Sequence, residues 1–174
     1  GKRPVIHFDG DTGFGIENED ALDLENFTVL SVHTAGPEGC VIANSSNGPE
    51  SGWILANDGQ GANGWLTPYW FNGIPYDRMW GPRLEQGFHV LSATYDQSVG
   101  KAIKTIRVNG AEAARKEVDG GPLTYAAHAT TTVGSLRGQS WFRGSIAEII
   151  VLKTADPEKR DTVERYLQSK YGLR

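Results

Sequence analysis

Along most of the chain, apolar residues alternate with polar ones over short segments that glycine, proline, asparagine or aspartate separate. That pattern predicts β-strands joined by turns, because successive side chains of a strand point to opposite faces. We expect strands at residues 4–8, 27–35, 40–44, 53–57, 88–95, 102–108, 111–118, 130–134 and 141–153. Turn signals recur about every 8 to 12 residues, which is typical of an all-β sandwich.

Two of these strands are apolar on both faces. In residues 27–35 (FTVLSVHTA), Phe27 and Val29 fall on one face, and Leu30 and Val32 fall on the other. Residues 141–153 (WFRGSIAEIIVLK) show the same two-sided pattern. A strand that buries both faces needs a covering layer on each side of its sheet. We therefore expect both strands to lie in the interior of a sheet.

The strongest turn signal is Asn109-Gly110, between residues 102–108 and 111–118. Both residue types accept the positive φ values that a tight type I′ turn demands, so the two strands are predicted to form a hairpin. Five basic residues lie along it, namely Lys101, Lys104, Arg107, Arg115 and Lys116. They either contact an acidic polysaccharide or form a solvated face.

The spacing of apolar residues changes from the two-residue period of a strand to that of a helix only at the end of the chain. Asp156 is a helix N-cap followed by Pro157 at the first helical position, and apolar residues then recur at helical spacing. We predict one helix over residues 157–170 that packs on the sandwich. A chain of 174 residues is long enough to bury one core. The whole chain, 1–174, is therefore expected to be a single domain.

Composition narrows the classes of partner. Seventeen Lys and Arg face 21 Asp and Glu, for a net charge of −4, which argues against a nucleic-acid partner. No apolar run approaches the length of a membrane span, and the first residues do not resemble a signal peptide. The single cysteine, Cys40, excludes an internal disulfide and a cysteine-based zinc cluster. We expect Cys40 to be a small buried hydrophobe.

Residues 53–80 hold four of the five tryptophans, set among Gly, Asn, Asp and Pro. Pro68 lacks a backbone donor, so residues 65–72 are expected to be an edge or bulged strand. If this segment is extended, Trp65 and Trp70 point to opposite faces. Some of the rings should therefore fill the core while others lie on the surface.

Rings among amide and carboxylate groups suit a sugar ligand. A ring stacks on the apolar face of the sugar while polar side chains bond its hydroxyl rim. The predicted binding residues are Trp65, Trp70, Tyr76 and Trp80 for stacking and Asn72, Asp77 and Arg78 for hydrogen bonding. The competing interpretation is that the rings only plug a core of short, twisted strands.

Four stretches occur in an order that resembles a known family. They are VIHFDG from residue 5, NFTV from 26, FHVLSATYD from 88 with VNG from 108, and FRGSIAEIIV from 142. The sequence resembles the concanavalin A-like lectin/glucanase superfamily, specifically its laminin-G-like (LamG type 3) domains of bacterial extracellular proteins. The resemblance implies a two-sheet antiparallel jelly roll that often serves as a carbohydrate-binding or adhesive module, often with a structural calcium ion.

Glu148 shares a face with Ile146 and Ile150 by alternation. An unpaired carboxylate buried there would cost several kcal/mol, so it needs a partner. One candidate, in line with the resemblance, is a structural Ca²⁺ that ties the first strand to the last. Its ligands would be the carboxylates of Glu148, Asp9 and Asp11, with the Gly10 carbonyl as a further candidate. The alternative is a salt bridge, or backbone hydrogen bonds near a strand end.

The leading hypothesis is a non-catalytic module of a larger secreted or cell-surface protein that binds a polysaccharide or oligosaccharide. A glycosidase needs two carboxylates flanking the scissile bond. The E-x-D-x-x-E run that glucan-hydrolysing members of the superfamily carry does not occur here, so no catalytic residue is predicted. Two alternatives stay open. One is a protein-interaction, adhesion or spacer domain, and the other is a glycoside hydrolase or lyase with an unrecognised acid pair.

Overall fold

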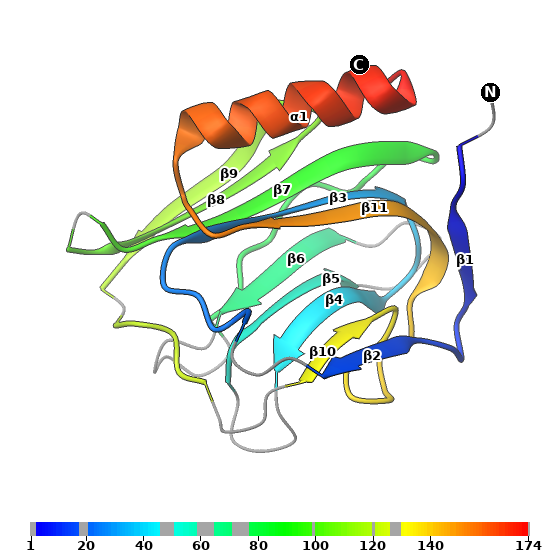
Figure 1. The fold of residues 1–174 in the computed structure, drawn as a ribbon, viewed down its shortest axis with the longest axis horizontal. Helices are drawn as coiled ribbons and strands as arrows, with labels where there is room; N and C mark the ends of the chain where they lie inside the picture. Colours follow the sequence, from blue (N-terminus) through cyan, green and yellow to red (C-terminus); the bar gives the residue numbers. More distant parts are fainter. Residues whose placement is uncertain are drawn as a thin grey trace.

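The computed structural model is a sandwich of two antiparallel β-sheets, with a helix against the outer face of the larger sheet (Figure 1). It describes residues 3–17, 21–45, 51–58, 65–70, 77–98, 100–119, 121–125 and 130–173. The predicted two-sheet sandwich with a C-terminal helix is confirmed. Within these ranges, no helix is long and apolar enough to cross a membrane.

The larger sheet orders six described strands as β1-β11-β3-β7-β8-β9. Their bounds are β1 Ile6–Asp9, β3 Phe27–Thr34, β7 Phe88–Asp96, β8 Ala102–Val108, β9 Ala111–Val118 and β11 Arg143–Leu152. β3 pairs with β11 on one side and β7 on the other, and β11 also pairs with β1. The two-sided apolar pattern therefore predicts both interior strands correctly.

The smaller sheet orders five described strands as β2-β10-β4-β5-β6. Their bounds are β2 Phe14–Glu17, β4 Gly39–Ser45, β5 Trp53–Asp58, β6 Trp65–Trp70 and β10 Thr130–Val133. β6 ends this ladder, in agreement with the edge position that Pro68 predicts. Residues 77–79 run beside β6, where the Trp70 N–H donates to Asp77 O (3.0 Å) and the Met79 N–H donates to Pro68 O (3.2 Å).

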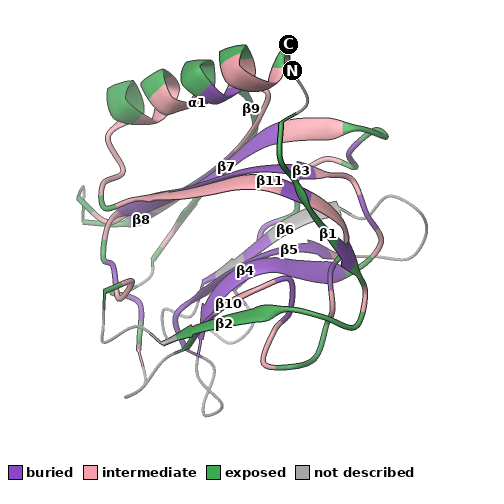
Figure 2. Ribbon diagram, turned by 45° about the vertical axis from the view of Figure 1, so that its right-hand side comes forward, coloured by how far each residue is buried: buried purple, intermediate pink, exposed green. Residues whose placement is uncertain are grey.

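The core lies between the two sheets and is rich in aromatic rings. Its largest fully buried rings are Trp53, Trp70, Tyr95, Phe8, Phe27 and Phe142. Figure 2 shows that buried positions run along β3, β4 and β5. Because each ring of this kind buries about 150–250 Å², these residues supply much of the hydrophobic stabilisation.

Helix α1 (Pro157–Tyr171) covers the outer face of the six-stranded sheet (Figure 1). The Asp156 carboxylate accepts hydrogen bonds from two backbone N–H groups of the first turn, and Gly172 ends the helix in the left-handed conformation. Leu167 is fully buried against Leu30 and Val90. The predicted helix, its N-cap and its packing on the sandwich are therefore confirmed.

The predicted hairpin joins β8 to β9. Asn109 and Gly110 occupy its turn with φ values of 49° and 81°, and Val108 pairs with Ala111. Positive φ at both central positions is the pattern of a type I′ turn, whose twist matches that of the flanking strands.

Candidate functional site

The aromatic segment of residues 53–80 is divided between core and surface. Trp53 on β5 and Trp70 on β6 lie opposite each other in the ladder and are 2% and 1% exposed. Trp70 stacks on Tyr95 of the other sheet, with ring centroids 6.1 Å apart. The prediction that Trp70 is a stacking platform for a ligand is wrong, because the pairing of β6 with β5 turns this ring into the core.

Asp77 and Lys104 form an ion pair inside the sandwich, with side chains that are 2% and 0% exposed. The Lys104 ammonium lies 5.1 Å from the centre of the Trp70 ring. Burial and the charge of Lys116 lower the pKa of Lys104, whereas the Asp77 carboxylate in contact with it favours the charged form. Asp77 thus holds residues 77–79 on the core. The prediction that Asp77 bonds a ligand is wrong, and Lys104 does not belong to a solvated face.

Trp80, Arg78 and Asp58 form an exposed cluster that we call the Trp80 patch. Trp80 is 45% exposed, and the Arg78 guanidinium carbon lies 4.4 Å from its ring centroid. Arg78 Nη1 also lies 3.2 Å from Asp58 Oδ2. Asp77 and Met79 point into the core, so the alternate residues point outward. The patch presents a ring, a cation and a carboxylate together, and ligand contacts by Arg78 and Trp80 stay a prediction.

The other predicted binding residues are described in part or not at all. The backbone of Trp65 lies opposite Asp58 in the ladder, next to a member of the Trp80 patch. Its side chain lies outside the described part of the structure, as do Asn72 and Tyr76. The roles assigned to these three residues stay predictions.

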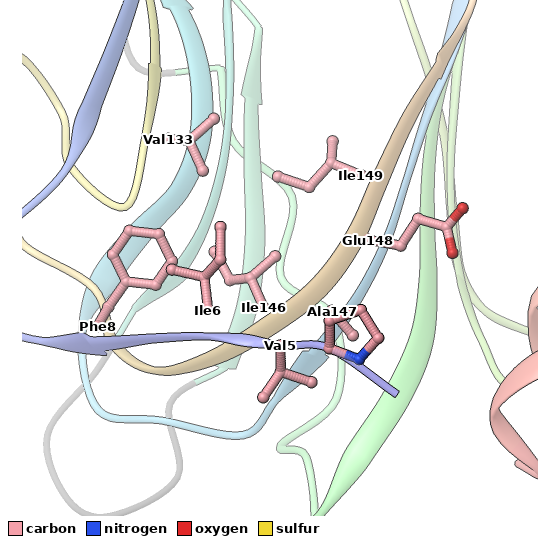
Figure 3. A pocket seen from close by; sticks show the side chains of 9 residues that line it. Val5, Ile6, Phe8, Val133, Ile146, Ala147, Glu148 and Ile149 are labelled. Atoms are coloured by element: carbon pink, nitrogen blue, oxygen red, sulfur yellow. The ribbon is translucent and has the colours of Figure 1, made fainter. Parts of the chain in front are cut away.

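Glu148 is paired with the helix rather than with Asp9 and Asp11. Its carboxylate accepts hydrogen bonds from Lys170 Nζ (2.8 Å) and the Tyr171 hydroxyl (2.9 Å). Figure 3 shows Glu148 pointing away from the side of β11 on which Phe8 lies. The salt-bridge alternative is confirmed, and the ligand set of Asp9, Asp11 and Glu148 is wrong. The physical reason is that alternation along β11 turns Glu148 to the face that α1 covers.

Asp9 and Asp11 lie at the far end of β1, where Asp9 pairs with Arg143. A hydrogen bond from the Asp11 carboxyl is the main cause that lowers the pKa of Asp9 to about 2, and the same contact raises the pKa of Asp11. Among the described residues, no group of three or more His, Cys, Asp or Glu side chains gathers as a metal site would require. Calcium binding stays a prediction without assigned ligands, and the effect of a chelator on the melting temperature tests it.

The outer face of the five-stranded sheet carries a cation that the sequence analysis missed. The centre of this face is small and apolar, with Cys40, Ala43, Ile54 and Ala56 buried beneath Leu136. Cys40 is thus the buried hydrophobe that was predicted. The next residue, Arg137, donates a hydrogen bond from Nη2 to Ser45 Oγ at the end of β4. The sequence feature that could have indicated this position is Arg137-Gly138 between two predicted strands, because glycine between strands marks a turn.

An apolar slot opens beside β1 (Figure 3). The edge strands β1 and β2 lie on this side of the sandwich (Figure 1). The volume of the slot is about 350 Å³, and its apolar lining includes Ile6, Phe8, Val133 and Ile146. Phe14 of β2 meets Phe8 edge-on, with centroids 5.8 Å apart. Ile6, Phe14 and Ile16 are each 52% exposed. Such a surface suits an apolar partner better than a sugar.

No protein-family model matches the chain, and no curated protein matches it in sequence. Solved structures do resemble it. The CBM40 module of the Ruminococcus gnavus IT-sialidase, bound to α2,3-sialyllactose, has a TM-score of 0.73 at 14% identity, covering 94% of this chain and 97% of that one. The SAP-like pentraxin of Limulus polyphemus has a TM-score of 0.63 at 16% identity, covering 91% and 79%. Domains LG4-5 of mouse laminin α1 have a TM-score of 0.64 at 15% identity, covering 86% and 42%.

Identities at this level establish the fold. The chain has a jelly-roll fold of the concanavalin A-like type, the architecture that these structures share. This confirms the fold that the resemblance of the four sequence motifs implied. The fold also hosts different functions, so the site must decide between them.

Proposed function

We propose that the chain is a non-catalytic carbohydrate-binding module that binds a polysaccharide or oligosaccharide through the Trp80 patch. The observation that carries this proposal is the half-exposed Trp80 ring, held against Arg78 with Asp58 beside it. An indole offers a sugar a stacking surface, while a guanidinium and a carboxylate bond its hydroxyl groups. The similar sialidase module bound to sialyllactose supports a sugar as the class of ligand.

Two carboxylates on the helix side of the larger sheet support the non-catalytic assignment. Glu148 is held by Lys170 and Tyr171, and Glu164 is held by Ser92 and Arg107. Both carboxylates are thus committed to partners within the protein, whereas a glycosidase needs its acid pair available to flank the scissile bond. Release of reducing ends from any glycan would overturn this assignment in favour of a hydrolase.

Replacing Trp80 with Ala should weaken binding to the best ligand of a glycan panel by about 10-fold or more, because truncating a central aromatic anchor typically costs about 2 kcal/mol. Calorimetry or affinity electrophoresis against plant, algal and animal glycans measures this effect. Tyr166→Ala is the matched control, since Tyr166 is 51% exposed and also carries a cation, Lys170, 5.2 Å from its ring centroid. It lies on α1, away from the patch.

The control should bind like the parent protein. Equal affinities of the parent, Trp80→Ala and Tyr166→Ala proteins would contradict the role of the patch. If the parent protein bound no glycan in the panel, the proposed function itself would be contradicted.

We infer a second candidate function from the apolar slot: an adhesion or spacer role in which β1 and β2 dock on another domain of a secreted or cell-surface polypeptide. Exposed apolar residues on edge strands favour such docking. Amide hydrogen exchange in β1 and β2 should then be slower when the adjoining domains of the polypeptide are present. Unchanged exchange would contradict this candidate, and exchange in β9, the opposite edge strand of the larger sheet, serves as the internal control.

A further inference from the structure

The turn between β10 and β11 has an unusual residue at its tip. Leu136 and Gln139 exchange two backbone hydrogen bonds, of 2.7 and 2.8 Å, and enclose only Arg137 and Gly138. The φ values of these two residues are 52° and 72°. Positive φ at both positions is the pattern of a type I′ turn, whose first position strongly prefers Asn, Asp or Gly.

An arginine in this conformation costs conformational energy, because its Cβ crowds the backbone and no short polar side chain relieves the strain. The turn between β8 and β9 is of the same kind and uses the ordinary pair, Asn109-Gly110. The chain therefore places a favoured residue, Asn109, at the first position of one turn and a disfavoured residue, Arg137, at the same position of the other. Strained backbone of this sort points to a function for the side chain that it carries.

The Arg137 side chain lies over the outer face of the five-stranded sheet. Its Nη2 donates to Ser45 Oγ, and its Nε is buried with no hydrogen-bond partner in the described structure. Thr130 lies opposite Ser45 in the ladder and is exposed. A guanidinium and hydroxyl groups thus meet at one end of β4 and β10.

Arg137 differs in its partners from three other arginines of the chain. Arg78, Arg107 and Arg160 each lie within ion-pair distance of a carboxylate. No such carboxylate pairs with Arg137 among the residues that the structure describes. A guanidinium without a carboxylate partner among the described residues is suited to an anion supplied by a ligand.

We propose that Arg137, together with the Ser45 hydroxyl, binds the carboxylate of an acidic sugar. This proposal rests on the proposed carbohydrate-binding function and assigns it a substrate class. A carboxylate is planar and matches the fork of a guanidinium with two parallel hydrogen bonds. The hydroxyl groups of a sugar then complement those of Ser45 and Thr130. The site lies on the same sheet as the Trp80 patch but at the opposite end of β4 and β5, so it is a second, ionic contact point that is separate from the stacking contact.

The test is Arg137→Asn, which removes the cation and installs the residue that the turn prefers. A binding role predicts that the melting temperature rises by about 2–4 °C and that affinity for oligosaccharides of uronic or sialic acids falls by about 10- to 100-fold. A purely structural role of Arg137 predicts that the melting temperature falls. Arg165→Gln, at an exposed position of α1 on the other sheet, is the control and should change neither quantity.

Each oligosaccharide is also measured after its carboxyl groups are reduced to alcohols. The parent protein should bind the reduced form about 10-fold or more weakly, whereas Arg137→Asn should bind both forms alike. Arg137→Lys keeps the charge without the fork and should recover only part of the difference.

Three outcomes overturn the proposal while leaving the proposed function intact. The first is glycan binding by Arg137→Asn that still discriminates the carboxylated from the reduced form. The second is a lower melting temperature of this variant. The third is a dependence on Arg137 that is confined to sulfated glycans, which would assign the residue to a sulfate ester. If neither charged nor neutral glycans bind the parent protein, the carbohydrate-binding function fails together with this inference.

Discussion

His33 is a fully buried titratable residue inside the sandwich. Its Nδ1 lies 3.0 Å from Ser31 Oγ, and its ring meets Phe142 edge-on with centroids 5.7 Å apart. Burial is the main cause that lowers its pKa to about 4. Between about pH 4 and pH 6.5, the His33 imidazole is therefore neutral in the folded protein and protonated in the unfolded chain.

This difference predicts a loss of stability in acid. The unfolded chain binds a proton at His33 near pH 6.5, whereas the folded chain does so only near pH 4. The contribution of His33 to stability is thus complete above about pH 6.5 and is lost as the pH falls to about 4, by about 3 kcal/mol in all. Urea unfolding between pH 7.5 and pH 4 measures the loss.

Replacing His33 with Gln should flatten this part of the pH dependence, because an amide has no proton to gain. His89→Gln is the matched control, since His89 faces His33 across the β3–β7 ladder but is only partly buried. Equal pH slopes for the parent protein and His33→Gln would rule out His33 as the source of the acid sensitivity.

Helix α1 is held to the larger sheet by a buried carboxylate as well as by apolar contacts. Glu164 accepts hydrogen bonds from Ser92 Oγ (2.6 Å) and Arg107 Nε (3.1 Å), and its side chain is only 3% exposed. Glu164→Ala should lower the free energy of unfolding by about 3 kcal/mol, because it leaves Arg107 and Ser92 without their shared partner. Urea denaturation measures the change.

Glu112→Ala is the control for Glu164→Ala, because it removes an exposed carboxylate instead of a buried one. Glu112 pairs with Arg115 at 4.0 Å on the exposed face of β9, so its removal should cost less than about 0.5 kcal/mol. Equal effects of the two substitutions would show that the Glu164 network does not fasten the helix.

Elements with a clear local signature were predictable from sequence. Proline at residue 68 predicts an edge strand, and β6 is one. Asp156 and Pro157 predict the start of α1. β2 was not predicted, because its four residues, Phe14–Glu17, are too short a pattern to distinguish from the acidic loop that follows. Its strand character comes from pairing with β10, which lies more than 100 residues away in sequence.

At the scale of the whole molecule, the two outer faces of the sandwich differ. The outer face of the larger sheet is covered by α1 (Figure 2). The apolar side of the helix buries Leu30 and Val32. The outer face of the smaller sheet instead carries Arg137 at the Ser45 end of β4, and the Trp80 patch lies at the opposite end, beside Asp58. The helix therefore completes the burial of one sheet, and both proposed ligand contacts lie on the side of the other.

Local periodicity is enough to place the strands, the hairpin and the helix, because each depends on side-chain alternation or on the backbone properties of Pro, Gly and Asn over a few residues. Which side chains are buried, and which residues they contact, could be determined only from the tertiary structure. Trp70 and Trp80 look alike in sequence, yet strand pairing buries one and exposes the other. Glu148 meets Lys170, and Arg137 meets Ser45, across 22 and 92 positions of sequence. Contacts at such separations depend on sheet order and register, which no short segment of the chain encodes.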